Sequence, residues 1–322
     1  MLSKGKGSAG SKALRQGGKA VKVALILRGE ITDQSWNTVG YQGLLAAQDQ
    51  FGVEIAYRES VQPPEYEKVF SDYARQGYNL VIGHGSEFGS AAVKTAEEFP
   101  GVYFAVTNSD VKGPNLAGLD TKNEEMGYIA GCIAALLSKS RVVAFIGATK
   151  IVAMARAEQG FFEGVKAFGP DCKVLSAYIG SFDNEEMGRK TGLELIAQKA
   201  DVLFNNDDAA GLGVMRVAEE KGVIAIGSDY DQKTIAPGAV LTSVLANVTP
   251  MILSIVEEVV DDAFKPGVVR MYGFDTGTYD LTPLDLSMVT QAQAGKIYAV
   301  RDQLVSGEVK LPHISAFPEG QD

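Results

Sequence analysis

Apolar and polar positions follow one another along this chain in a repeated strand–helix–strand order. The apolar run at residues 21–27, VKVALIL, precedes an amphipathic segment at residues 38–52 and a second short β-rich run at residues 53–60. Further helical and β-rich segments then alternate at residues 66–78, 79–85, 90–100 and 102–110. Because strands joined by helices at this spacing form right-handed βαβ units, the pattern predicts a parallel sheet covered by helices.

The same order starts again after residue 120. Its helical and β-rich segments lie at residues 124–140, 141–148, 157–169, 173–182, 185–200, 201–206, 211–222 and 223–229. No Pro- or Ser-rich linker separates the two series, so we expect two doubly wound lobes. Beyond residue 229 the chain has an extended run, a helix at residues 250–264 and a strand-rich stretch at residues 268–284. A late helix that returns to the first lobe would make each lobe discontinuous, with several crossing segments acting as a hinge.

The composition agrees with a soluble protein of two lobes. The chain has 322 residues, of which 46% are hydrophobic and 22% are charged. Its net charge of −10 argues against a nucleic-acid partner. Two cysteines and two histidines are too few for a dense metal-binding cluster, so we expect neither a metal nor another cofactor. A disulfide between Cys132 and Cys172 stays open.

The first twenty residues are rich in Gly, Ser and Lys. This composition predicts a disordered arm, and it lacks the apolar stretch of about 7–15 residues that a secretory signal needs. Two interpretations remain open: either the protein is cytoplasmic, or its export signal has been removed or replaced. No stretch of the chain approaches the roughly 20 apolar residues of a membrane helix.

Polar and aromatic residues gather directly after the predicted strands, where the ligands of parallel sheets bind. The clusters contain Asp33, Gln34, Trp36, His84, Ser86, Glu87, Phe88, Thr107, Asn108, Asp110, Phe182, Asp183, Asn206, Asp207, Asp208, Asp229 and Asp231. Each cluster also fits a helix N-cap, and Trp36 also fits a packing role. An aromatic beside a carboxylate or amide recurs in both series, however. This favours a clamp in which Trp36 and Phe182 stack on a small heteroaromatic ring while carboxylates accept its N–H groups.

Catalytic motifs are absent from the sequence. There is no Gly-x-Ser-x-Gly, and His84 and His313 are the only histidine bases. Gly211 and Gly213 lack the third glycine of a dinucleotide fingerprint, and no phosphate-binding P-loop occurs. We therefore expect a binding protein with no catalytic residues.

Motifs spread over residues 21–281 resemble the basic membrane protein family of ABC-transporter substrate-binding proteins, which includes purine nucleoside receptors. The matching segments are DQSWN, TVGYQGL, GYNLVIGHGSEFG, EEMGYIAG, EQGFFEGVK, GSFDN, ADVLFNNDDAAGLGVMRVAEEKGVIAIGSDYDQ and APGAVLTSV. Their order and spacing are specific as a set. The resemblance implies a type I periplasmic-binding-protein fold, in which two Rossmann-like lobes joined by a three-segment hinge close on a ligand.

The resemblance also implies roles for single residues. Asp33 and Trp36 fall where the family holds and stacks the ring, although the family usually has Phe at the position of Trp36. Phe182 matches the second aromatic face, Asp208 lies in the segment that faces the ligand, and Asp229 matches an acid that contacts the sugar in nucleoside receptors.

Two positions depart from the family pattern. Nucleoside-type members carry a Lys after LTSV, where this chain has Leu245, Ala246 and Asn247. Without that cation a free nucleobase or related heterocycle is favoured over a nucleoside. Asn108 stands where many members carry an acid, which changes what the site accepts.

The first lobe should comprise residues 21–120 and 246–268, and the second lobe residues 121–245 and 269–322. The ligand-binding residues should be Asp33, Gln34, Trp36, His84, Phe88, Asn108, Phe182, Asp208, Asp229 and Asn247.

The expected function is that of a monomeric receptor, periplasmic or lipid-anchored at the cell surface. It would deliver a purine nucleobase, nucleoside or related heterocycle to an ABC permease. The alternatives are a cytoplasmic ligand-sensing regulator of the same fold and, less favoured, a nucleoside hydrolase.

Overall fold

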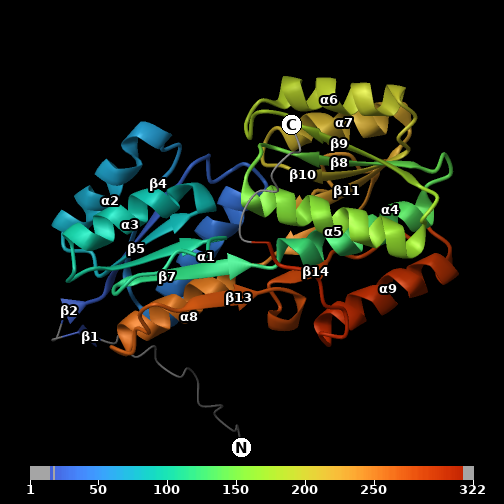
Figure 1. The fold of residues 1–322 in the computed structure, drawn as a ribbon. Coiled ribbons are helices and arrows are strands. Elements are labelled where there is room, and N and C mark those ends of the chain that lie inside the picture. Colours follow the sequence, from blue (N-terminus) through green and yellow to red (C-terminus); the bar gives the residue numbers. More distant parts are fainter. Residues whose placement is uncertain (1–14, 17–18, 315–322) are drawn as a thin grey trace, which may run out of the picture.

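Two α/β lobes lie side by side in the computed structural model, which describes residues 15–16 and 19–314 (Figure 1). The first lobe contains a six-stranded sheet in the order β13-β7-β6-β5-β3-β4, and all its neighbours pair in parallel. Its strands are β3 (Lys22–Leu27), β4 (Glu54–Arg58), β5 (Leu80–His84), β6 (Tyr103–Thr107), β7 (Leu116–Thr121) and β13 (Val269–Tyr272). Helices cover both faces of this sheet, which explains why β3 is a continuous apolar run.

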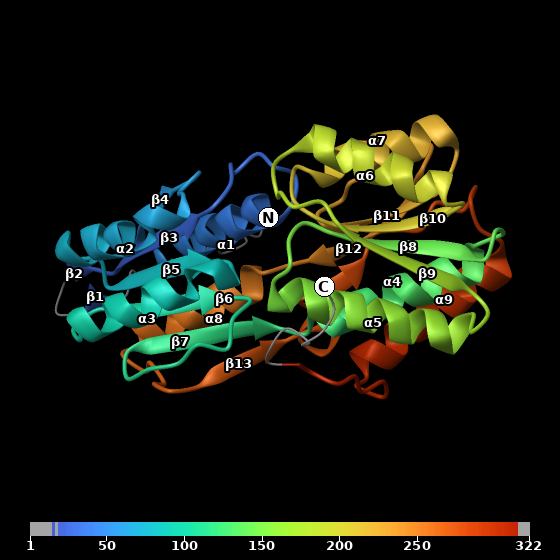
Figure 2. The same cartoon turned by 45° about the horizontal axis from the view of Figure 1, so that its top comes forward.

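Successive residues of β3 contact helices on opposite faces of the first sheet. Leu25 packs in a cluster with α1 (Trp36–Phe51) and α8 (Thr249–Val260), whereas Ile26 packs in a cluster with α2 (Tyr66–Arg75) and α3 (Gly89–Glu98). Figure 2 shows α8, which comes late in the chain, packed in the first lobe.

The second lobe repeats the arrangement around a sheet in the order β14-β12-β11-β10-β8-β9. Its strands are β8 (Val142–Gly147), β9 (Lys173–Tyr178), β10 (Val202–Asn206), β11 (Ile224–Asp229), β12 (Val240–Ala246) and β14 (Tyr279–Leu281). Only the edge pair β12–β14 is antiparallel. One face carries α4 (Asn123–Leu137), α5 (Val152–Phe168) and α9 (Gln291–Val305), and the other carries α6 (Glu185–Ala197) and α7 (Gly211–Lys221).

Glycines bring α4 and α5 into backbone contact. A Cβ atom on Gly127 of α4 would overlap the carbonyl of Ala157, and one on Gly160 of α5 would overlap the carbonyl of Glu124. The two helices therefore pack closely where the chain first enters the second lobe.

The chain crosses between the lobes three times. It leaves β7 for α4, returns from β12 to α8, and leaves β13 for the short 3₁₀ helix η3 (Phe274–Thr276) and β14. Two doubly wound lobes with three crossings confirm the expected type I fold. No helix of the described residues is long and apolar enough to cross a membrane, and both cysteines are free thiols.

The structure corrects two of the expected boundaries. Strand β13, expected in the second lobe, pairs with β7 at the edge of the first sheet, whereas β12 keeps Ala246 in the second sheet. A four-residue, partly exposed edge strand leaves only a weak apolar pattern. Within the arm expected at residues 1–20, β1 (Arg15–Gln16) pairs with β2 (Lys19–Ala20), while residues 1–14 and 17–18 lie outside the described residues. Backbone pairing of two residues needs no apolar periodicity, so the sequence pattern did not reveal it.

Candidate functional site

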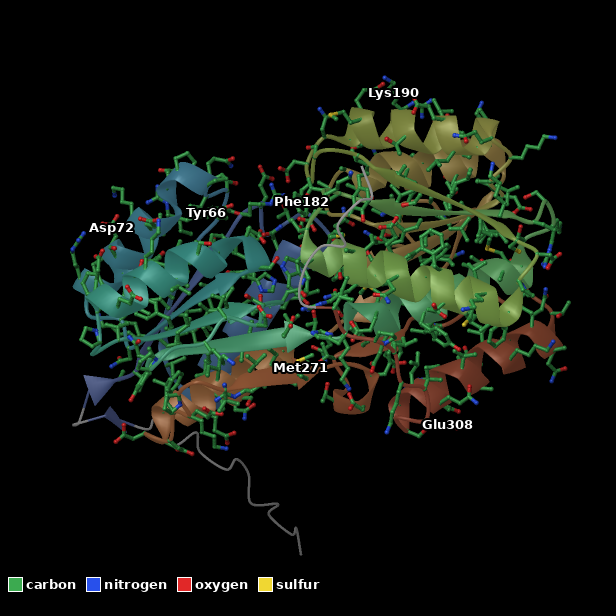
Figure 3. The ribbon with its side chains drawn as sticks, in the orientation of Figure 1. Tyr66, Asp72, Phe182, Lys190, Met271 and Glu308 are labelled. Carbon is green, nitrogen blue, oxygen red and sulfur yellow. The ribbon has the colours of Figure 1, made fainter. Side chains whose placement is uncertain are left out.

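A cavity lies between the lobes, at the carboxyl ends of the strands of both sheets. It is narrow: the centres of water-sized spheres can occupy about 40 Å³ of it. It is lined by Trp36, Gly85, Ser86, Glu87, Asn108, Asn123, Ile151, Met154, Phe182, Asn206, Asp208 and Asp229. We call this space the interlobe cavity. Figure 3 shows Phe182 at the side of the second lobe that faces the first.

Trp36 forms one wall of the interlobe cavity from the first turn of α1. Its indole stacks on the ring of His84, with ring centroids 4.3 Å apart and planes 10° apart. Because His84 covers one face of the indole, the other face is the one available to a ligand ring. The structure therefore places Trp36 where the sequence predicted it, and His84 behind it.

His84 supports Trp36 as a neutral, fully buried side chain. Burial lowers the pKa of His84 to about 4. Its Nε2 lies 2.8 Å from the carbonyl oxygen of Trp36, which can only accept, so Nε2 carries the proton. Nδ1 then accepts from the hydroxyl of Thr107 at 2.9 Å. His84, expected among the ligand-binding residues, does not itself line the cavity.

Asp33 organises the loop that presents Trp36. Its carboxylate accepts from the backbone N–H groups of Ser35, Asn37 and Thr38, each at 3.0 Å. It also accepts from the side chains of Asn37 and Thr38 at 2.7 and 2.8 Å. These bonds satisfy N–H groups at the start of α1 that have no helical partner. Asp33, expected among the ligand-binding residues, does not line the interlobe cavity, and its oxygens are engaged in the loop.

Three further residues of the expected set also lie away from the cavity. Gln34 is an exposed loop residue with φ of 54°, and its backbone N–H donates to Thr38 Oγ1 at 3.0 Å. Phe88 is fully buried beside Tyr66, with ring centroids 4.3 Å apart, because the 3₁₀ turn η2 (Ser86–Phe88) directs it into the α2–α3 layer. Asn247 is exposed and accepts from the backbone N–H of Thr249 at the start of α8.

Asn108 lines the cavity from the first lobe, as expected. Its side-chain oxygen accepts from Thr121 Oγ1 and from Asn123 Nδ2, the latter at 2.7 Å. The amide nitrogen is therefore the group that Asn108 can present to a ligand. Both partners lie where the chain enters the second lobe, so this network joins the cavity to the hinge.

Carboxyl groups line the second-lobe side of the cavity. Burial raises the pKa of Asp229 to about 7, even though Ser35 Oγ lies 3.2 Å from its Oδ2. Burial raises the pKa of Asp208 well above its usual value, and the nearby charges of Asp33 and Asp229 raise it further. Burial likewise raises the pKa of Glu87 on the first lobe. A ring with N–H groups could donate further hydrogen bonds to these carboxyl groups.

Asp207 makes the second-lobe side still more acidic. It is 1% exposed, and neither carboxyl oxygen has a hydrogen-bond partner among the described residues. Burial, with the neighbouring charge of Asp229, raises its pKa well above the usual value. Asp207 therefore lies near two other buried acids of the second lobe, Asp208 and Asp229.

Several lining residues were absent from the expected set. Glu87 and Asn206 follow predicted strands and were recognised as strand-end residues without being assigned to the site. Ile151 and Met154 follow β8, so the same strand-end rule would have found them. Asn123 lies at the start of α4, and no sequence signal marked it.

Neither histidine of the described residues lines the cavity. His84 is buried behind Trp36, and His313 contacts Asp120 and Glu124 rather than the cavity. The described residues contain no group of three or more His, Cys, Asp or Glu side chains placed to hold a metal ion.

Two doubly wound lobes around an interlobe cavity define the class of two-lobed solute-binding folds. A solved ABC-transporter solute-binding protein from Aeropyrum pernix K1 superposes with a TM-score of 0.83 over 92% of this chain and 94% of that chain, at 18% identity. The chain belongs to the Bmp family, described as ABC transporter substrate-binding protein PnrA-like, whose model matches residues 20–315. The family resemblance expected from the motifs is thereby confirmed.

Similar proteins include some named for transport and one named for regulation. Basic membrane protein A of Borreliella burgdorferi is 28% identical over 96% of this chain and 90% of its own length. The ABC transporter nucleoside-binding protein BmpA of Lactococcus lactis is 24% identical over 88% of this chain and 86% of its own length. Transcriptional activator protein med of Bacillus subtilis is 29% identical over 82% of each chain.

Proposed function

We propose that this protein is the solute receptor of an ABC importer and captures a purine nucleobase, nucleoside or related heterocycle between its lobes. The observation that carries the proposal is the shared wall of the interlobe cavity. Trp36 from the first lobe and Phe182 from the second line the same space, with Asp208 and Asp229 beside them. Stacking on aromatic faces contributes about 1–3 kcal/mol per base, and micromolar binding requires about −8 kcal/mol.

The acidic lining supports a ligand that donates hydrogen bonds. Asp208 and Asp229 can accept from ring N–H or exocyclic amine groups, and the Asn108 amide nitrogen can donate to a ring nitrogen or carbonyl. The nucleoside-binding relative from Lactococcus lactis supports a base as the ligand. Ala246 is fully buried in β12 and does not line the cavity, so no cation takes the place of the family's lysine at that position. This favours a free base over its nucleoside.

Ligand capture would shift the lobes toward a closed state that a membrane permease recognises. In this proposal the receptor acts as a monomer outside the cytoplasmic membrane, either free in the periplasm or held by a lipid anchor.

Calorimetric titration with adenine, guanine, hypoxanthine, adenosine and guanosine tests the ligand class. We expect micromolar binding of at least one free base, and weaker binding of its nucleoside. If none of the five binds with a dissociation constant below about 1 mM, the purine assignment is wrong. Nucleosides incubated with the protein should remain intact. Release of free base would instead establish the hydrolase alternative.

A ligand-sensing regulator is the second candidate, favoured by the similarity to transcriptional activator protein med. Fractionation of cells that express the protein from its own gene separates the two candidates. A receptor is recovered with the envelope or periplasm, and a regulator with the cytoplasm.

A further inference from the structure

Arg28 lies directly after β3 in the first lobe and reaches across to the second lobe. Its Nη1 and Nη2 donate to the two carboxylate oxygens of Asp183, each at 3.1 Å. Its guanidinium carbon lies 4.0 Å from the centroid of the Phe182 ring, and its Nη2 lies 3.5 Å from Asp208 Oδ2. The side chains of Arg28 and Asp208 are 15% and 8% exposed, whereas that of Asp183 is 59% exposed, so the Arg28–Asp183 pair lies at the solvent edge of these contacts.

Arg28 lies behind the wall of the interlobe cavity and not within it. It touches Phe182, Asp208 and, at 3.8 Å, Glu87, all of which line the cavity, while Arg28 itself does not. Together with Asp183, Arg28 lines a separate groove on the outside of the lobe boundary. The Arg28–Asp183 pair therefore stands between the cavity and that groove.

These contacts of Arg28 can form only when the two lobes lie against each other. Arg28 belongs to the first lobe, whereas Phe182, Asp183 and Asp208 belong to the second, so opening the hinge separates them. A guanidinium suits this place because it is planar, pairs with a carboxylate through two parallel bonds and stacks on an aromatic face. Lysine keeps the charge but can form neither the two-bond pair nor the flat stack.

We propose that Arg28 is the clasp of this receptor: it holds the lobes closed and fixes the Phe182 ring against the ligand. The proposal rests on the proposed function for its consequence on ligand release, but not for its consequence on lobe closure. Arg28 is a positioning residue, since it acts through Phe182 and Asp208. Ser35 Oγ, 3.2 Å from Asp229, is a second contact across the same boundary and leaves some closure when Arg28 is removed.

The first experiment measures lobe closure without ligand. Spin labels are attached to Lys68→Cys on α2 and Lys190→Cys on α6, whose side chains are 68% and 76% exposed, in a Cys172→Ser background. We expect Arg28→Ala to shift the label distances toward a longer, open population. Arg28→Lys should resemble Arg28→Ala more than the unchanged protein.

The second experiment measures adenine dissociation by stopped-flow tryptophan fluorescence. We expect Arg28→Ala to speed dissociation about tenfold with little change in the association rate, because Arg28 makes its contacts with the second lobe only after the lobes have closed. Asp183→Asn should act in the same direction, and the effects of Arg28→Ala and Asp183→Asn should not add in the double variant.

Arg189→Ala is the matched control. Arg189 makes a similar two-bond pair with Glu220, at 2.7 and 2.9 Å, but both residues belong to the second lobe. If Arg28→Ala and Arg189→Ala give the same label distances and the same dissociation rates, Arg28 does not hold the lobes closed and the proposal is wrong. If adenine does not bind at all, the purine assignment fails while the label distances still decide the role of Arg28.

Discussion

Replacement of Trp36 by alanine tests the binding role of the interlobe cavity most directly. His84 already covers one face of the indole, at 4.3 Å, so only the opposite face remains for a ligand. One aromatic face contributes about 1–3 kcal/mol to binding a base, which corresponds to an affinity about 5- to 150-fold weaker in Trp36→Ala. Trp36→Phe keeps an aromatic face and should lose less.

The assay is calorimetric titration with adenine, paired with the melting temperature of each variant. Phe264→Ala is the matched control, because Phe264 stacks on Tyr103 at 4.3 Å in the first lobe and does not line the cavity. It should lower the melting temperature and leave the affinity unchanged. The same result for Trp36→Ala would refute the reasoning and make Trp36 a packing residue.

Three further predictions concern the residues around the cavity and the helix contacts. The pKa of Asp229 is about 7 in the folded protein and about 4 in the unfolded chain. Between these pH values the folded protein keeps a proton that the unfolded chain has lost. The free energy of unfolding should therefore fall as pH rises from about 4 to 7. Asp229→Asn should flatten that dependence in urea titrations and remove the strengthening of base binding expected as pH rises through 7. Asp33→Ala removes five hydrogen bonds from the start of α1 and should cost about 2–4 kcal/mol of unfolding free energy; a loss below about 0.5 kcal/mol would contradict its role in the loop. Gly160→Ala should lower the melting temperature strongly because its Cβ overlaps a backbone carbonyl, whereas Gly295→Ala, with open space around it, should raise it slightly.

The sequence was sufficient to predict the fold and three of the residues that line the interlobe cavity. Alternating apolar runs gave the two parallel sheets, and the strand-end rule brought Trp36, Asn108 and Phe182 to one cavity. It was not sufficient to tell a residue that lines the cavity from one that supports its neighbour. Asp33 and Phe88 lie within a few residues of lining positions, but their directions depend on loop hydrogen bonds and on a 3₁₀ turn.

Arg28 illustrates a different limit of sequence reasoning. It follows a strand like the other site residues, yet its partners Phe182 and Asp183 are more than 150 positions away along the chain. A cation after one strand and an aromatic–acid pair after another are each ordinary features. Arg28 contacts Phe182 and Asp183 only because the fold brings the two lobes against each other.

The three crossings also determine when each lobe can fold during synthesis. The first sheet is completed by β13, and the apolar face of α8 covers that sheet with Met251, Ile252 and Ile255, all fully buried. Both elements leave the ribosome after nearly all of the second sheet. The first lobe, although it begins the chain, can therefore bury the α2–α3 side of its core early, but it cannot complete the α1 side until most of the second lobe has been made.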